Sequence, residues 1–213
     1  LNPERAVIAI DMYGNQASRV VNGISFLNDV GGTANDNGVN VTTYARNFID
    51  NWAAAPLLAG GDGASSFNLA EIMRDIRWGL ANDGIRILIE GLDAGLPYEI
   101  QLLTREITER LRSFDIEIED ELVVDNYSSN GVVGRDIWST SKGFGWRGTI
   151  IAPEDGEISI IMKGDLGGEP PLPGTDGNPI LQAMIVQRGV QAKWTSLGTG
   201  ASALLGGDLT DPE

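Results

Sequence analysis

The sequence predicts an all-β protein, an antiparallel jelly-roll β-sandwich with one short helix at about residues 68–78. Three observations lead to this prediction. Short β-branched segments recur along the chain, and several alternate apolar with polar residues, as half-buried strands do. Glycine supplies 28 of the 213 residues, a high share that suits many tight turns between strands. Only one segment has a clear helical period.

The first part of the chain predicts strands separated by a loop. Ala6–Met12 is a β-branched run followed by turn residues, and Val20–Phe26 is a second apolar stretch. Asn22-Gly23 inside that stretch is typical of a hairpin turn or a β-bulge. Residues 28–40 hold Gly, Asn and Asp with little apolar content, so we expect an exposed loop before strand character returns at Val39–Tyr44.

The helix is predicted from an apolar stripe. Asn68, with Glu71 three residues later, forms a capped start. Because such a stripe usually faces a core, we interpret Met73 and Trp78 as core residues and not as cofactor contacts. The stripe is formed by residues at positions i, i+3, i+4 and i+7, namely Leu69, Ile72, Met73 and Ile76.

Alternating segments in the middle of the chain predict three hairpins. Residues 85–89 and 98–102 alternate on either side of a turn, and residues 146–151 and 157–163 flank Asp155-Gly156. Residues 114–118 pair with residues 121–126 across Glu119-Asp120. In the third hairpin the acidic residues alternate with Phe and Ile, so we expect them on a solvated sheet face and not in a catalytic cluster.

The end of the chain predicts a long loop, a last core strand and a tail. Residues 164–178 are rich in Pro and Gly, and residues 180–186 form an apolar strand. We expect one β-sandwich domain over residues 1–188 and a Gly/Ala-rich tail over residues 189–213, docked on its own domain or on a neighbouring copy. The apolar groups available for that self-association are Trp194, Leu197, Leu204 and Leu205.

Composition excludes several kinds of chemistry. The chain has no His and no Cys, which removes Ser-His-Asp and Cys-His catalysis, disulfides and zinc sites with His or Cys ligands. Its 15 Lys and Arg against 30 Asp and Glu give a net charge of −15, so we expect neither nucleic-acid binding nor insertion into membranes. We expect an extracellular or cell-surface protein without a cofactor, with structural calcium at Asp36 or Asp62 left open.

The order of the segments resembles the galactose-binding-domain-like jelly rolls, and malectin-like modules especially. The resemblance rests on Asp11-Met12-Tyr13-Gly14, on the stretch from Ile89 to Leu103, on the two strands around Asp155-Gly156, and on Asn178-Pro179-Ile180. It spans about residues 6–188. It implies a non-catalytic module that binds carbohydrate through loops at one end of the sandwich, with aromatic side chains stacked on sugar rings and an Asp close before Asn-Pro. The ligand-binding residues that it implies are Tyr13, Trp138, Trp146, Asp176 and Asn178.

Two other functions stay open. The same fold could be a self-assembling structural subunit of an extracellular filament, tube or surface layer, since a Cys-free, acidic and Gly-rich composition resists non-specific association. A glycosidase with two carboxylates is the mainstream hydrolytic mechanism that the composition leaves. No two of the 30 acidic residues are singled out for that role, so a non-catalytic carbohydrate-binding module is the favoured hypothesis.

Overall fold

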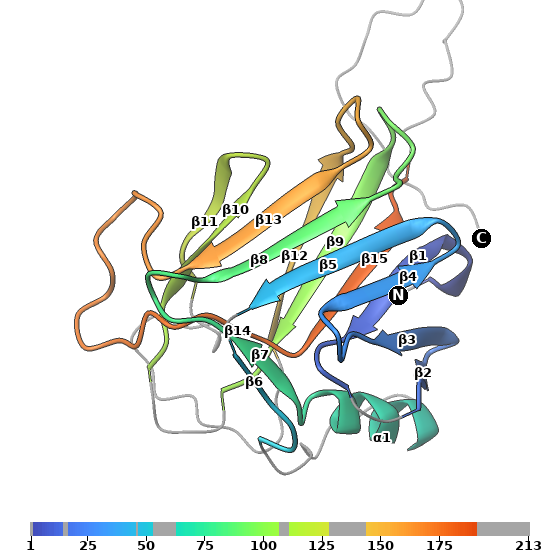
Figure 1. Ribbon diagram of the computed structural model, residues 1–213, viewed down its shortest axis with the longest axis horizontal. Helices are drawn as coiled ribbons and strands as arrows, with labels where there is room; N and C mark the ends of the chain where they lie inside the picture. Colours follow the sequence, from blue (N-terminus) through green and yellow to red (C-terminus); the bar gives the residue numbers. More distant parts are fainter. Residues whose placement is uncertain are drawn as a thin grey trace, which may run out of the picture.

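The protein is a β-sandwich. The computed structural model describes residues 2–14, 17–45, 47–52, 63–106, 111–127 and 144–190. Within these ranges, two six-stranded sheets face each other, and a three-stranded sheet and one α-helix lie at one end of the sandwich (Figure 1). This architecture confirms the expected all-β jelly-roll sandwich with a single short helix.

The strands form three sheets, and each strand is hydrogen-bonded to the one named after it. The first sheet holds β12 (Phe144–Ile151), β9 (Pro97–Thr104), β15 (Ala183–Arg188), β1 (Ala6–Asp11), β3 (Ile24–Asn28) and β2 (Arg19–Val21). The second holds β11 (Glu121–Tyr127), β10 (Phe114–Ile118), β13 (Ile158–Lys163), β8 (Ile85–Glu90), β5 (Val39–Ala45) and β4 (Thr33–Asp36). The third holds β14 (Ile180–Leu181), β7 (Ile76–Trp78) and β6 (Asn47–Ile49). A 3-10 turn, Pro3–Arg5, precedes β1, and the pairs are antiparallel except for β1 with β3.

The main core lies between the two large sheets. Alternate residues of β8 and β9 point into it, and the inward side chains of both strands are almost completely buried. Each buried aliphatic side chain of this size contributes about 1.5–3 kcal/mol to folding. The inward residues, which the alternation predicts correctly, are Ile85, Ile87 and Ile89 on β8 and Tyr98, Ile100 and Leu102 on β9.

Two predicted hairpins are wrong, although their strands are right. β8 pairs with β5 and β13, whereas β9 pairs with β12 and β15, so the turn between β8 and β9 crosses from one sheet to the other. The turn between β12 and β13 crosses back. The two turns bind each other: Leu92 N donates to Gly156 O over 3.0 Å, and Ala152 N donates to Leu96 O over 2.9 Å. Alternation sets the face of a strand but leaves its neighbour undecided.

The helix lies earlier than predicted. α1 spans Gly63–Ile72 and packs beside β2, with Ile72 in a small apolar cluster on that side of the first sheet. The second half of the expected helix forms β7, because Ile76–Trp78 pairs with β6 on one side and with β14 on the other. Backbone pairing on both sides outweighs the weak helical preference of this short segment.

Other local predictions had mixed outcomes. The Asn22-Gly23 turn is confirmed, with φ of 49° and 79°, and so is the β10–β11 hairpin across Glu119-Asp120. β4 lies within the expected loop at residues 28–40, and Gln182 divides the expected last strand into β14 and β15.

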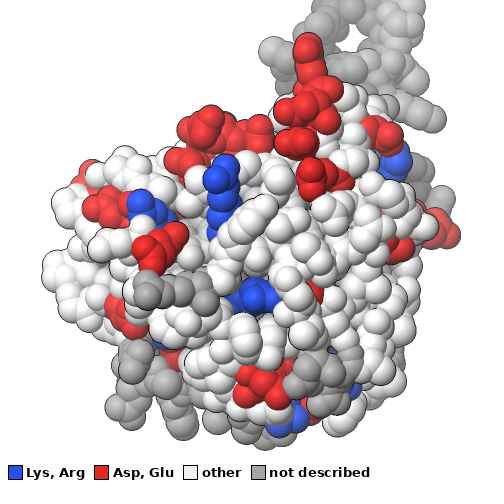
Figure 2. All heavy atoms as spheres, viewed as in Figure 1, with Lys and Arg blue, Asp and Glu red and all other residues white. Residues whose placement is uncertain are grey.

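The acidic face of the third predicted hairpin is only partly solvated. Asp115 on β10 is buried, because its carboxylate accepts hydrogen bonds from Asn126 N and Leu166 N and lies under the segment at residues 164–178. Acidic side chains nevertheless gather at the surface over the β10–β11 turn and over the turns that follow β8 and β12 (Figure 2). Part of the negative charge in view therefore lies on solvated turns.

The first and last described strands lie side by side. β1 pairs with β15, and Arg5 Nε donates to Arg188 O over 2.8 Å. Gly189 N then donates to Pro97 O at the start of β9. The predicted tail contacts through Trp194, Leu197, Leu204 and Leu205 lie outside the described residues. In the part of the chain that the structure describes, no helix has the length and apolar character of a membrane span.

Candidate functional site

The three-stranded sheet has two faces with different side chains. Its register places Phe48 opposite Arg77 and Ile49 opposite Ile76, and residues directly opposite in an antiparallel pair share a face. Phe48 and Arg77 therefore lie on one face, whereas Ile49, Ile76 and Trp78 lie on the other.

The face with Trp78 lines a cavity of about 300 Å³. We call this cavity the indole pocket. It combines two indole rings and three aliphatic side chains with one guanidinium and one amide. The lining residues are Ile49, Trp52, Ile76, Trp78, Leu80, Arg112 and Asn178. A cavity that combines apolar and aromatic side chains with a few placed polar groups is typical of a small-molecule site.

Asn178 is fixed in the pocket wall by the turn that follows β7. Its Oδ1 accepts a hydrogen bond from Ala81 N over 2.7 Å, and Gly79 N donates to the carbonyl of the next residue, Pro179, over 3.2 Å. A Cβ atom on Gly79 would lie 2.0 Å from Gly84 O, so only glycine allows this close approach. These contacts hold the start of β14 against the end of β7.

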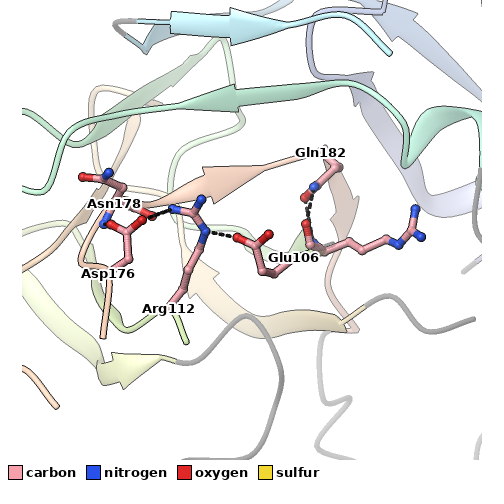
Figure 3. Close-up of polar contacts among 6 residues, drawn as sticks. Glu106, Arg112, Asp176, Asn178 and Gln182 are labelled. Atoms are coloured by element: carbon pink, nitrogen blue, oxygen red, sulfur yellow. Dashed lines mark hydrogen bonds and ion pairs between the residues drawn. The ribbon is translucent and has the colours of Figure 1, made fainter. Parts of the chain in front are cut away.

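Arg112 is held in the wall by two carboxylates and a carbonyl (Figure 3). Its Nε donates to Glu106 Oε2, and its Nη1 donates to Asn178 O over 2.8 Å. Nη1 also lies 3.4 Å from Asp176 Oδ2. The side chain of Glu106 is 1% exposed and that of Asp176 is 24% exposed, so one carboxylate is buried and the other borders solvent.

Backbone contacts fix the two partners of Arg112 in place. Asp176 N donates to Leu111 O over 2.7 Å and Ser113 N donates to Asp176 O over 3.2 Å, which aligns the segment around Asp176 beside Arg112. On the other side, the buried Gln182 binds both backbone groups of Arg105, accepting from its N–H and donating to its C=O. Gln182 thereby positions Glu106, the next residue, at the guanidinium (Figure 3).

Three donors near the pocket have no partner among the described residues. Asn178 uses its side-chain oxygen only, and no hydrogen bond involves its Nδ2 or Arg112 Nη2. Trp78 Nε1 is buried without a partner. Trp78 Nε1 is the buried one of the three, and Asn178 is half-buried. Donors without a partner beside a cavity indicate capacity for a ligand rich in acceptors.

The opposite face of the sheet carries a cluster whose groups bind one another. We call Tyr13, Asp29, Phe48 and Arg77 the closed cluster. The Tyr13 and Phe48 rings stack with centroids 3.7 Å apart, and Arg77 Cζ lies 5.6 Å from the Tyr13 centroid. Arg77 Nε donates to Asp29 Oδ2 over 2.8 Å, and Tyr13 N donates to Asp29 Oδ1. Burial raises the pKa of the fully buried Asp29, and the Arg77 hydrogen bond opposes that shift.

Asp11 lies next to the closed cluster. Burial, and then the charge of Asp75, raise the pKa of Asp11 to about 8, while Arg19 acts in the opposite direction. Asp11 Oδ1 has no hydrogen-bond partner among the described residues. Burial also raises the pKa of Asp75 to about 6. This side of the sheet therefore favours a protonated Asp11 at neutral pH.

The sequence-predicted site residues do not all converge. Asn178 lines the indole pocket and Asp176 binds Arg112 in its wall. Tyr13 lies on the opposite face, and Trp146 on β12 packs against the main core. Trp138 lies outside the described residues.

Four residues of the pocket and its wall were not predicted from the sequence. The apolar stripe of residues 69–76 led to the interpretation of Trp78 as a core residue, and no motif singled out Trp52, Glu106 or Arg112. The position of Trp78 could have been found from the alternation of Ile76-Arg77-Trp78. This alternation indicates a strand with Ile76 and Trp78 on one face and Arg77 on the other.

The calcium alternative gains no support from the described residues. Within them, no group of three or more acidic side chains is arranged to hold a metal ion. Asp36 lies on β4 opposite Val39, and Asp62 lies outside the described ranges.

Comparison with known proteins identifies the fold. Neither a protein-family model nor a curated protein sequence matches the chain. The ANXUR1 extracellular domain from Arabidopsis thaliana is similar, with a TM-score of 0.54 and 14% identity over 86% of this chain and 48% of that one. The plant receptor-like kinase ANX2 gives a TM-score of 0.55 at 14% identity, over 86% of this chain and 48% of that one.

A third similar structure is a Bacteroides uniformis β-glucuronidase, with a TM-score of 0.52 and 13% identity, over 86% of this chain and 18% of that one. This chain thus spans about half the length of the two plant proteins and a smaller part of the glucuronidase. These likenesses confirm, at the level of fold, the resemblance to malectin-like and galactose-binding-domain-like jelly rolls.

Proposed function

We propose that the chain is a non-catalytic carbohydrate-binding module and that the indole pocket is its sugar site. The observation that carries this proposal is the placement of Trp52 and Trp78 beside Asn178 and Arg112 in one cavity. A sugar ring has an apolar C–H face that packs on an aromatic ring, and hydroxyls that accept hydrogen bonds from amide and guanidinium groups. The unused donors of Asn178 and Arg112 suit such a ligand.

A binding role fits the carboxylates better than hydrolysis does. Glycosidases place two carboxyl groups on either side of the scissile bond in an open site. Glu106 and Asp176 instead contact the same guanidinium, and Glu106 is not among the residues that line the cavity. Their arrangement supports a structural role that orients Arg112.

An extracellular location is part of the proposal. One similar structure is described as an extracellular domain and another as a plant receptor-like kinase, and the Cys-free acidic composition agrees with an exported protein. The alternative of a self-assembling subunit depends on the tail residues, which lie outside the described ranges.

The test is a glycan array followed by calorimetry with the best binder, using the whole chain. Trp52→Ala should weaken binding at least tenfold, because stacking on an aromatic ring carries much of the affinity for a sugar face. Phe48→Ala is the matched control, since it removes an exposed aromatic from the opposite face of the same sheet and should leave affinity unchanged.

Two results would contradict the proposal. One is an array without any binder. The other is a binder whose affinity is the same for the wild type and the Trp52→Ala variant, provided that both unfold at similar temperatures.

A further inference from the structure

We infer that Asp75 positions Trp52 in the indole pocket, and that a proton shared between Asp75 and Asp50 makes sugar binding tighter in weak acid than at neutral pH. This inference rests on the proposed function and concerns the regulation of the same site. Asp75 lies directly before β7, and the residue that follows it, Ile76, lines the pocket. Asp75 itself is buried and does not line the cavity, so it can act on a bound sugar only through its neighbours.

A backbone hydrogen bond links Asp75 to Trp52. Asn51 N, one residue before Trp52, donates to Asp75 Oδ1 over 2.6 Å. Asn51 has a φ of 51°, in the left-handed region that asparagine adopts more readily than most residues. Its side chain turns back to the preceding residue, where Nδ2 donates to Asp50 Oδ1 over 2.8 Å. Asn51 thus ties two carboxyl groups to the turn that leads from β6 to Trp52.

The two carboxyl groups face each other across this turn. The β6–β7 register pairs Ile49 with Ile76, so the next position on each segment brings Asp50 opposite Asp75. Like charges directly opposite in an antiparallel pair repel each other. The two side chains can hydrogen-bond each other only while one of them holds a proton, because carboxylates are acceptors only. A proton between them therefore closes the turn, and its loss leaves two negative charges in opposition.

The surroundings of Asp75 favour the proton. Burial is the largest cause that raises its pKa to about 6. The hydrogen bond from Asn51 N acts in the opposite direction, and the hydrogen bond with Asp50 and the charge of Asp50 raise the pKa again. Arg74 favours the charged form, but its guanidinium also binds Glu71 on α1. The net preference of this site is for a neutral Asp75.

The neighbouring strand β1 adds another carboxyl group, that of Asp11. Burial, and then the charge of Asp75, raise the pKa of Asp11 to about 8, while Arg19 lowers it. Asp11 is therefore largely neutral below pH 8, and a change of sugar affinity with a midpoint below pH 7 points to Asp75 and Asp50.

The pKa of Asp75 gives the direction of the effect. Its ordinary value is 3.8 and its value in the ordered turn is about 6, so the stability that the proton gives the turn is complete below about pH 4 and is lost as pH rises through 6. Trp52 directly follows this turn. A looser turn leaves the indole ring less ordered before binding, and ordering it then reduces the affinity for a sugar.

The test is calorimetry at pH 4.5 and pH 7.5 with the tightest-binding neutral oligosaccharide of the glycan array, whose own charge does not change with pH. The wild type should bind at least about threefold more tightly at pH 4.5. Asp75→Asn keeps an oxygen that accepts from Asn51 N and gains an N–H that donates to Asp50. This variant should bind with the same affinity at both pH values, and at pH 7.5 more tightly than the wild type. Asp50→Asn should flatten the pH profile in the same way.

Asp93→Asn is the matched control. It makes the same change of charge in an exposed ion pair with Arg188, in the turn that follows β8, so it should keep the wild-type dependence on pH. Hydrogen exchange of the Asn51 amide, corrected for the intrinsic rate at each pH, is a second readout that needs no sugar. Its protection should be greater at pH 4.5 than at pH 7.5 in the wild type and equal at both in Asp75→Asn.

The outcomes separate this inference from the proposed function. A wild-type affinity that does not change with pH would overturn the inference and leave the sugar site standing. A pH profile that neither Asp75→Asn nor Asp50→Asn alters, or an Asn51 amide equally protected at both pH values in the wild type, would do the same. Absence of sugar binding at both pH values would instead reject the proposed function, and the inference with it.

Discussion

The two faces of the β6–β7 pair carry similar residue types in different surroundings. The side chains of one face contact one another, whereas those of the other face border a cavity. On one face, Phe48 and Arg77 stack and pair with Tyr13 and Asp29, and the polar atoms bind one another. On the other face, Trp78 and Arg112 border a cavity of about 300 Å³, and Trp78 Nε1 has no partner among the described residues. An aromatic next to a cation therefore does not by itself identify a binding site.

The difference lies in which hydrogen bonds the protein already makes. In the closed cluster, the charge of Arg77 is matched by one buried carboxylate, so removing either partner would leave an uncompensated buried charge. In the indole pocket, Arg112 contacts two carboxylates, while Trp78 Nε1 has no hydrogen-bond partner among the described residues. We therefore expect substitutions in the closed cluster to change stability and substitutions in the indole pocket to change sugar affinity.

The largest expected effect is loss of stability in Arg77→Met. Asp29 is fully buried, and without Arg77 its charge would keep only neutral hydrogen-bond donors such as Tyr13 N among the described residues, which costs about 3–5 kcal/mol of unfolding free energy. Urea unfolding at pH 7 measures this loss. Combining Arg77→Met with Asp29→Asn should recover more than half of it, and a double variant as unstable as the single one would show that the ion pair is not the cause.

The second expected effect is a change of pH dependence in Asp11→Asn. The pKa of Asp11 in the folded protein is raised from 3.8 to about 8, so its contribution to stability is complete below about pH 4 and is lost as pH rises through 8. Asparagine has no proton to lose. At pH 8 the variant should be more stable than the wild type by at least about 1 kcal/mol, since a pKa difference of one between the folded and unfolded states corresponds to about 1.4 kcal/mol of free energy.

Unfolding of the Asp11→Asn variant and the wild type from pH 4 to pH 8 measures this difference. The gap should be smallest at pH 4. A variant that is less stable than the wild type at pH 8 would contradict the proposed protonation of Asp11 among Asp29, Asp75 and Arg19.

The smallest expected effect is that of Phe48→Ala on stability. Phe48 is 50% exposed, and its stacking on Tyr13 should contribute about 0.5–1.5 kcal/mol beyond area burial. A double-mutant cycle with Tyr13→Ala measures the coupling. A coupling near zero would show that the stack does not stabilise the fold. Any loss of sugar affinity in Phe48→Ala would contradict the assignment of sugar binding to the opposite face alone.

The fold was predictable where the pattern of single strands decides it. Alternation placed Ile85, Ile87 and Ile89 on the buried face, and Asn22-Gly23 indicated the β2–β3 turn. The partners of β8 and β9 were not predictable, because a period of two fixes the face of each strand and says nothing of its neighbour. Both six-residue connections look like hairpin turns in sequence, yet each crosses between sheets.

The candidate site was predictable only at its C-terminal part. Asp176 and Asn178 stood out through the resemblance, close to the Pro that precedes β14. Arg112 and Glu106 did not, since their roles depend on contacts with Asp176 and Gln182 that are distant in sequence. The apolar stripe placed Trp78 in a helix that the pairing of β7 with β6 and β14 prevents.

The antiparallel pairing of β1 with β15 has a consequence for protein architecture. Because Arg5 contacts Arg188 directly, the start of the first described strand and the end of the last one lie at the same place. A fold with this property can be inserted into a loop of a host protein without stretching either junction, and it tolerates circular permutation with a short linker. We therefore expect a graft of residues 2–190 into a surface loop of an unrelated host to keep the indole pocket intact.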